Sequence, residues 1–302
     1  MAKSRNAVKM LISDRIFMVI VTSILLLVLF LMIYPFWNVF MTSISDQELL
    51  RTMGNVSFLP RGFSMEGYRL LFQNNMLLRY YANTVTYALT GTAFLLIVSS
   101  LTGYALSVKT FCLRKVMMTL MIITMYVSGG LIPSYLLIRK LGWFDTLWVM
   151  TVPGALSVYN CIVFKTFFQQ IPDELKEAAF LDGANDLQLL IRIILPLSKA
   201  LLATFAIFSI VGFWNGWFDA LVYLRDTSRY PIQNYLRSLL VNMETLASDT
   251  MSKAASQARM TAQVYRVVRG AAIVVTTLPI MMVYPFFQKY FAKGVIVGSL
   301  KG

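Results

Sequence analysis

Long runs of hydrophobic residues without charges alternate with shorter charged segments along the whole chain. Six windows lack Asp, Glu, Lys and Arg and are apolar enough to cross a bilayer: 16–45, 80–108, 116–138, 146–164, 200–218 and 270–288. About 20 helical residues cross the roughly 30 Å hydrocarbon core, so the shortest window is long enough. Because uncharged runs of this length are typical of helices rather than barrel strands, the pattern predicts an all-α, polytopic membrane protein with six transmembrane helices.

The predicted spans leave three longer connections between them. We place the spans at 16–40, 83–108, 116–138, 146–168, 198–222 and 268–289, within a single transmembrane domain that takes in residues 1–302. The connections are loops at 46–79, 171–196 and 223–266. Basic residues precede the first span, and its apolar run is longer than that of a cleaved signal peptide, so we expect it to remain as an uncleaved helix.

Composition supports the membrane assignment and argues against a nucleic-acid-binding protein. Of the 302 residues, 58% are hydrophobic and 14% are charged, against roughly 45–50% and about 25% in a soluble domain. The net charge of +13 fits basic residues that flank spans beside anionic lipid headgroups, so we expect membrane lipid and no nucleic acid as a partner. The basic residues divide almost equally between the two predicted faces, and their number alone does not set the orientation.

Missing residue types narrow the function further. The sequence has no histidine, which excludes His-based metal sites and Ser-His-Asp triads, and its two cysteines cannot form a disulfide framework. It has no G-x-x-x-x-G-K-[ST] phosphate loop, so the chain is not itself a P-loop ATPase. The six uncharged windows lack the carboxylates that ion-coupled secondary carriers place in the membrane. Such a carrier, or a membrane-embedded enzyme that modifies glycans or lipids, stays as an alternative; we expect no catalytic residue and no metal.

The segment 171–200, IPDELKEAAFLDGANDLQLLIRIILPLSKA, joins the fourth and fifth spans. Pro172 and the acidic residues after it suit a helix start, and Gly183 suits a left-handed helix end. Asn185, with a glutamine three residues later, is typical of a capping box, and Pro196 predicts a break or bend before the fifth span. The sequence therefore predicts a helix, a glycine turn and a second helix that enters the membrane.

One face of the first predicted helix carries small residues. Leu175, Ala178, Ala179 and Asp182 recur at i, i+3, i+4 and i+7. Small side chains permit close approach by another backbone. The residues alone leave two interpretations open: an amphipathic helix that rests on the headgroups, and a docking helix for a soluble partner.

This segment resembles the EAA loop of ABC importer permeases. The family pattern, EAA…G…(I/L)-x-LP, is matched by Glu177-Ala178-Ala179, Gly183 and Ile194-Leu195-Pro196. The flanking sequences are similar to the carbohydrate branch of the family, of the maltose and oligosaccharide type. They are LIPSYLLIRKLGWFDTLWVMTVPGALSVYNCIVFKTFFQQIP before the loop, FWNGWFDALVYL after it, and YFAKGVIVGSLKG at the end. The resemblance covers nearly the whole chain, and one departure is Lys199-Ala200, where many members have proline.

The resemblance implies a transport subunit in the cytoplasmic membrane of a prokaryote, with no cofactor of its own. Its implied partners are a second homologous permease subunit, as a heterodimer, two copies of a cytoplasmic ATPase that binds ATP-Mg, and an extracellular solute-binding protein that delivers an oligosaccharide. It places both termini and loop 171–196 in the cytoplasm, and loops 46–79 and 223–266 outside. Part of 225–266 in the second outer loop is expected to touch the binding protein; its polar, Ala/Ser-rich centre fits a mobile loop equally well.

In such permeases the EAA loop forms a coupling helix that sits in a groove of the ATPase. Carried over to this chain, the ATPase-coupling residues are Glu177, Ala178, Ala179, Asp182, Gly183, Leu195 and Pro196. ATP-driven closure of the ATPase pair would then change access to the pathway by rigid-body rocking.

The candidate substrate-pathway residues are aromatic or carry amides. Trp214, Asn215 and Trp217 cluster at the outer end of the fifth span. Aromatic faces and hydrogen-bonding groups suit sugar rings, but an interfacial aromatic belt has the same composition, and for Trp217 we prefer the belt. Further candidates in the third and fourth spans are Tyr126, Tyr159 and Asn160.

Overall fold

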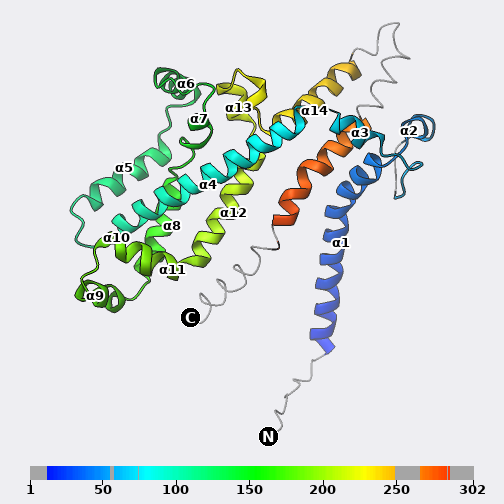
Figure 1. Ribbon diagram of the computed structural model, residues 1–302. Coiled ribbons are helices and arrows are strands. Elements are labelled where there is room, and N and C mark those ends of the chain that lie inside the picture. The colour runs from blue at the N-terminus through cyan, green and yellow to red at the C-terminus, as the bar shows by residue number, and fades with distance from the viewer. Residues whose placement is uncertain (1–11, 55–57, 74, 249–265, 284, 286–302) are drawn as a thin grey trace. The chain divides into compact units, whose positions relative to one another are not determined.

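The structure is a computed structural model that describes residues 12–54, 58–73, 75–248, 266–283 and 285 (Figure 1). Within these ranges all regular secondary structure is helical, which confirms the predicted all-α class. The chain divides into two compact units, one made of Met1–Leu71 and Met243–Val274, the other of Phe72–Asn242 and Val275–Gly302. Residues 249–265 of the predicted outer loop, and the last residues of the sixth predicted span, lie outside the described residues.

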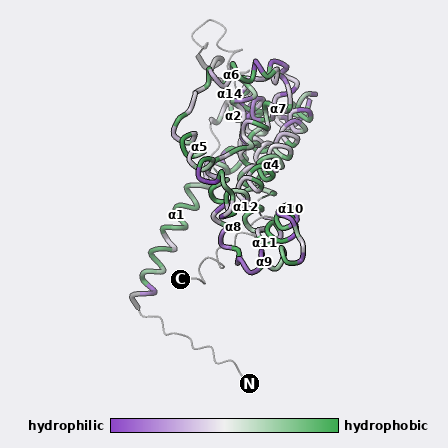
Figure 2. Tube along the Cα trace, turned by 90° about the vertical axis from the view of Figure 1, so that its left-hand side faces the viewer, coloured by the Kyte–Doolittle hydropathy of each residue, from purple (hydrophilic) through white to green (hydrophobic). Residues whose placement is uncertain are grey.

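The first unit contains the longest helix, α1 (Ile12–Ser43), with Pro35 inside it. Apolar side chains stand exposed all around α1 from Ile16 to Phe36, and Figure 2 shows it hydrophobic along nearly its whole length. A helix that is apolar on every side needs an apolar surrounding, so α1 is suited to lie in a bilayer. Two short helices follow: α2 (Gln47–Met53), which Asp46 caps by accepting from two backbone N–H groups, and α3 (Glu66–Phe72).

The second unit holds most of the other helices. In chain order these are α4 (Leu77–Ser107), α5 (Arg114–Tyr126), α6 (Leu131–Lys140), α7 (Leu147–Thr151), α8 (Val158–Gln169), α9 (Asp173–Leu181), α10 (Asp186–Leu189), a π-helical turn (Leu190–Ile194), α11 (Leu195–Leu197), α12 (Lys199–Asn215), α13 (Phe218–Tyr223), a 3-10 turn (Thr227–Arg229) and α14 (Ile232–Ser248). α14 and a further helix, Arg266–Val283, contribute residues to both units. In Figure 2 the segments around α9 and α10 and around α6 and α7 are the more hydrophilic parts of the second unit.

The core of the second unit forms where α4 packs against both α8 and α12 (Figure 1). Phe164 meets Phe205 edge to face with ring centroids 5.1 Å apart, and both side chains are buried. Gly103 of α4 allows this packing, because a Cβ there would lie 2.6 Å from the Cβ of Phe164. A larger residue at this position would push α4 away from α8.

In the described ranges, three helices are long and apolar enough to cross a bilayer: Asp14–Ser43 within α1, α4, and Arg266–Val283. Two further windows are bent helix pairs, so the described residues contain up to five spans if each pair counts as one. In the predicted span 116–138, α5 and α6 meet at 119°. Between them Gly130 has a φ of +80°, a backbone conformation that glycine adopts without steric cost.

The predicted span 146–168 is also interrupted. α7 ends at Thr151 and α8 begins at Val158, where Ser157 accepts a hydrogen bond from the backbone N–H of Asn160. Pro153 cannot donate a backbone hydrogen bond, which favours the end of α7 before it. Apolar composition defined this window, but the proline and the serine cap define where its helices stop and start.

Candidate functional site

The polar loop between α8 and α12 forms the helix–turn–helix that its sequence predicts. α9 begins at Asp173, with Pro172 as its N-cap rather than its first residue. At its end Gly183 has a φ of +80°, and Ala184 donates its backbone N–H to the carbonyl of Ala179 over 2.9 Å. This is the Schellman closure of a helix, in which a glycine in the left-handed region reverses the chain.

The second half of the loop starts with the predicted capping box. The backbone N–H of Gln188 donates to Oδ1 of Asn185 over 2.8 Å, and the backbone N–H of Asn185 donates to Oε1 of Gln188 over 3.0 Å. After a π-helical turn the chain bends by 82° at Ser198, two residues beyond Pro196. The buried Ser198 hydroxyl donates to the carbonyl of Ile194 over 2.7 Å, which satisfies one carbonyl at the bend.

The coupling residues predicted from the resemblance do not all lie on the same face of α9. Glu177 and Ala178 are exposed, whereas Ala179 is 6% exposed and packs in the hydrophobic core of its own chain. We expected Glu177, Ala178 and Ala179 to face a partner's groove together. The burial of Ala179 contradicts that expectation. Each helical residue is rotated by about 100° from the one before it, so Ala179 and Glu177, two positions apart, lie on nearly opposite faces of α9.

The other predicted coupling residues lie at the turn and the bend. Asp182 and Gly183 are exposed at the end of α9. Leu195 is half-buried against the same core as Ala179, and Pro196 is exposed. The most exposed of the large apolar side chains on α9 is one that sequence reasoning did not select: Leu181 is 90% exposed.

Two contacts fasten this loop to the end of α4. The hydroxyl of Tyr104 donates to Oδ1 of Asp186 over 2.5 Å. The Lys109 ammonium lies 3.1 Å from Oδ2 of Asp173, whose other oxygen accepts from Lys176 over 2.9 Å. Hydrogen bonds from Lys176 and Lys109 hold the pKa of the exposed Asp173 carboxyl below its usual value. Sequence reasoning missed Tyr104, because nothing local marks a partner so far along the chain.

The six predicted pathway residues fall into separate environments. Trp214 is only 7% exposed; its indole N–H donates to the carbonyl of Thr276 over 3.0 Å, and its ring packs against Tyr81. Asn215 is exposed and accepts a hydrogen bond from Gln233 over 3.4 Å. Trp214 therefore acts in packing, which its place in a Trp-Asn cluster did not reveal.

Trp217, three residues further on, lies under a cation. The guanidinium of Arg237 sits 4.1 Å from its ring centroid, a cation–π contact. Tyr126 at the end of α5 and Tyr159 at the start of α8 are 83% and 62% exposed, and Asn160 is half-buried. Among the described residues, no hydrogen bond or ring contact joins these last three to Trp217.

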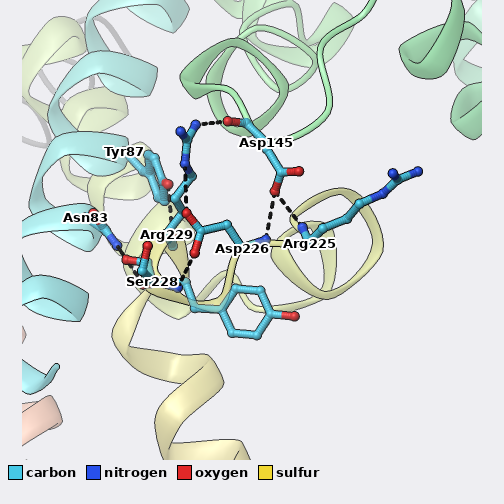
Figure 3. A network of polar contacts seen from close by, with 8 residues as sticks. Asn83, Tyr87, Asp145, Arg225, Asp226, Ser228 and Arg229 are labelled. Atoms are coloured by element: carbon cyan, nitrogen blue, oxygen red, sulfur yellow. Dashed lines mark hydrogen bonds and ion pairs between the residues drawn. The ribbon is translucent and has the colours of Figure 1, made fainter.

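A polar network outside the predicted set organises the segment after α13 (Figure 3). The Asp145 carboxylate accepts from the backbone N–H groups of Arg225, over 2.6 Å, and Asp226, over 3.0 Å. Arg229 donates to the carbonyl of Asp145 and pairs with Asp226 at 3.4 Å. Hydrogen bonds from Ser228 hold the pKa of the exposed Asp226 carboxyl below its usual value.

The same segment is tied to α4. The Tyr87 hydroxyl donates to the carbonyl of Arg229 over 2.8 Å, and the Asn83 amide donates to the carbonyl of Ser228 over 2.9 Å (Figure 3). These bonds fix residues 225–230 against two other parts of the second unit. Such a fixed base is suited to present the chain that follows it.

Apolar helices of bilayer length, joined by polar loops that carry their own short helices, define a helical integral membrane protein. Residues 1–297 match the family described as binding-protein-dependent transport system inner membrane component, and the chain belongs to that family. It is therefore a transport subunit rather than an enzyme, and the resemblance seen in its EAA segment is confirmed.

Several relatives cover nearly the whole chain. It is 36% identical over 289 residues to the polygalacturonan/rhamnogalacturonan transport system permease protein YtcP of Bacillus subtilis (strain 168), covering 96% of this chain and 99% of the relative. It is 37% identical over 272 residues to the protein LplC of the same strain, covering 89% and 90%.

A solved crystal structure shares the fold. It is that of a bacterial ABC transporter involved in the import of the acidic polysaccharide alginate, which matches with a TM-score of 0.83 and 32% identity over 93% of this chain and 99% of that one. The chain has the permease fold of ABC importers.

Proposed function

We propose that this chain moves an acidic oligosaccharide, delivered by an extracellular binding protein, through the cytoplasmic membrane. Two relatives with more than 30% identity support this proposal through the substrates in their names. One is named for the transport of polygalacturonan and rhamnogalacturonan, and the other for the import of alginate. Galacturonan and alginate are polymers of uronic acids, so both relatives handle chains of sugar carboxylates. The excess of basic residues, 27 against 14 acidic, suits an anionic substrate by long-range attraction.

The energy comes from a partner. We propose that two copies of a cytoplasmic ATPase hold ATP-Mg, and that each binds a permease subunit through the exposed face of its α9, here Glu177, Ala178 and Leu181. A second, homologous permease subunit completes the pathway. Loop 171–196 and both termini lie in the cytoplasm, and loops 46–79 and 223–266 lie outside, with six spans between them.

The packing of the loop supports rigid-body transmission. Ala179 of α9, Leu189 of α10 and Phe205 of α12 belong to one buried cluster. Since packed cores shift between discrete arrangements rather than deform, a displacement of α9 carries α12 with it. The Tyr104–Asp186 bond adds α4 to the moving group.

The test is uptake by the complete transporter in proteoliposomes. Permease heterodimer, ATPase and binding protein are reconstituted, and accumulation of a labelled oligogalacturonate is compared with that of a neutral maltooligosaccharide of equal length. We expect ATP-dependent uptake of the acidic sugar and little of the neutral one. Equal uptake of both would reject the acidic class, and uptake without ATP would reject the importer mechanism.

A further inference from the structure

A basic hollow opens beside the turn between α4 and α5. It has a volume of about 800 Å³, and four cationic side chains line it: Lys109 in the turn, Arg114 and Lys115 at the start of α5, and Lys165 on α8. Its wall also contains the apolar side chains of Phe111 and Met118, together with Thr110, Cys112 and Thr119. Three separate segments thus bring positive charge to one concave surface, which we name the basic hollow.

The charge of the basic hollow is not balanced by the chain. Lys109 pairs with Asp173, a carboxylate that Lys176 already shares. Within the described part of the chain, the other three cations have no carboxylate oxygen within 4.0 Å. Arg114 and Lys165 are nevertheless half-buried, so their charges are partly withdrawn from water. A bound anion would offset both the mutual repulsion and the lost hydration.

The N-terminus of α5 adds the positive end of a helix dipole to these cations. It carries two basic residues and no acidic one, and no side chain caps it. Cations are unfavourable at the positive end of a helix dipole, so this arrangement is costly without a negative partner. The helix end supports the site but does not define it; the four side chains do.

An apolar strip leads away from the basic hollow along α5. Met118, which lines the hollow, is followed at i+4 and i+7 by Ile122 and Met125, which are 40% and 50% exposed. They lie on one face of a helix that belongs to a predicted span. A free phosphate ion makes no use of such a strip, whereas an acyl chain does.

We infer that the basic hollow binds the phosphate headgroup of an anionic phospholipid, such as phosphatidylglycerol, with an acyl chain along Met118, Ile122 and Met125. Lys165 reaches the headgroup from α8, because the long stem of a lysine can lie along apolar surface while its ammonium stays at the headgroup. The inference rests on the proposed orientation, which puts the hollow at the cytoplasmic leaflet, where anionic lipids attract basic clusters.

The test measures lipid selectivity of the reconstituted transporter complex. Spin-labelled phosphatidylglycerol and phosphatidylcholine are compared for binding to the wild type and to the double variant Arg114→Gln/Lys115→Gln. Each neutralised charge is expected to lower the preference for phosphatidylglycerol about fivefold. Lys165→Gln should likewise lower the preference for phosphatidylglycerol about fivefold. The matched control is Arg139→Gln/Lys140→Gln, two consecutive exposed cations at the end of α6, which should keep the wild-type preference.

Three outcomes would overturn the inference. The first is a wild type without preference, or a double variant that retains it. The second is displacement of labelled phosphatidylglycerol by inorganic phosphate at equal concentration, which would make the hollow a free-anion site. The third is loss of the ATPase from the double variant with lipid preference unchanged, which would make the hollow a protein interface. Lipid selectivity is measured without any sugar. A complex that keeps its preference for phosphatidylglycerol but fails to take up the acidic oligosaccharide would therefore contradict the proposed function alone.

Discussion

The Tyr104 hydroxyl donates a 2.5 Å hydrogen bond to the carboxylate of Asp186, a residue 82 positions further along the chain. Tyr104 stands in the last turn of α4, and Asp186 is the first residue of α10. One end of a long apolar helix is thereby attached to the loop that carries the EAA sequence. The bond gives α4 a direct connection to that loop, in addition to its packing against α12, the helix into which the loop runs.

Replacing Tyr104 with phenylalanine removes this bond and little else. Hydrogen bonds to charged groups contribute about 1.5–3 kcal/mol, so Tyr104→Phe should lower the free energy of unfolding by up to that amount. We also expect fewer sugars imported per ATP hydrolysed, because α9 would move with less of the bundle. Thermal unfolding and paired uptake and ATPase assays measure both effects. Tyr34→Phe on α1 is the control. If Tyr104→Phe imports as many sugars per ATP hydrolysed as the wild type, α4 does not take part in coupling through this bond.

The left-handed glycine at the end of α9 gives a second prediction. Gly183 has a φ of +80°, and nothing lies within 4 Å of a Cβ built there, so Gly183→Ala introduces backbone strain without a clash. The expected cost is about 1–2 kcal/mol, with Gly183→Asn milder because asparagine tolerates this region. Gly183→Pro should abolish transport and ATPase stimulation while the protein still inserts.

The control for Gly183 is another left-handed glycine. Gly142, with a φ of +69°, also has open space around its Cβ position and lies outside the EAA loop. Gly142→Ala should cost similar stability and leave ATPase stimulation intact. If the two alanine variants lose stimulation equally, the effect of Gly183 is on folding rather than on coupling.

Local signals made the loop predictable from sequence. A left-handed glycine end and a capping box are set by residues within a few positions of one another, and both form at Gly183 and Asn185 as expected. The apolar windows likewise predicted where helices lie. They did not predict the break between α7 and α8, because hydropathy averages over Pro153 and the caps that stop a helix.

Long-range packing was not predictable in the same way. Trp214 reads as a sugar-stacking residue, yet its ring is buried and its indole donates to a backbone carbonyl from a distant helix. Ala179 belongs to the EAA sequence but serves its own core. Both outcomes depend on which helix lies beside the residue, and no pattern along the chain records that.

An exposed leucine on α9 tests the proposed ATPase contact. Leu181 is 90% exposed, so Leu181→Asp removes no packing within the chain. We expect normal insertion and thermal stability, and ATPase affinity weakened at least about fivefold if Leu181 contributes more than about 1 kcal/mol to the interface. Co-purification of the ATPase with the permease measures this. Leu59→Asp, at a leucine 76% exposed in loop 46–79, should leave ATPase binding unchanged, and equal binding by both variants would contradict the assignment of this face.

The Asp145 carboxylate should control the order of the segment after α13. It accepts two backbone N–H groups, from Arg225 and Asp226, and its own φ of +56° is unusual for a residue with a side chain. Asp145→Ala loses both bonds, and we expect faster hydrogen exchange at these two amides, by roughly tenfold or more for a loss of about 1.5–3 kcal/mol. Asp145→Asn keeps an acceptor oxygen and tolerates the left-handed backbone, so it should retain most of the protection.

The same pair of variants separates the segment's role from its stability. If residues 225–230 are the fixed base from which the outer loop reaches the binding protein, Asp145→Ala should weaken stimulation of ATPase activity by the binding protein while basal hydrolysis stays unchanged. Asp145→Asn should restore that stimulation. Full stimulation in Asp145→Ala, together with fast exchange at Arg225 and Asp226, would show that the binding protein does not need this segment to be ordered.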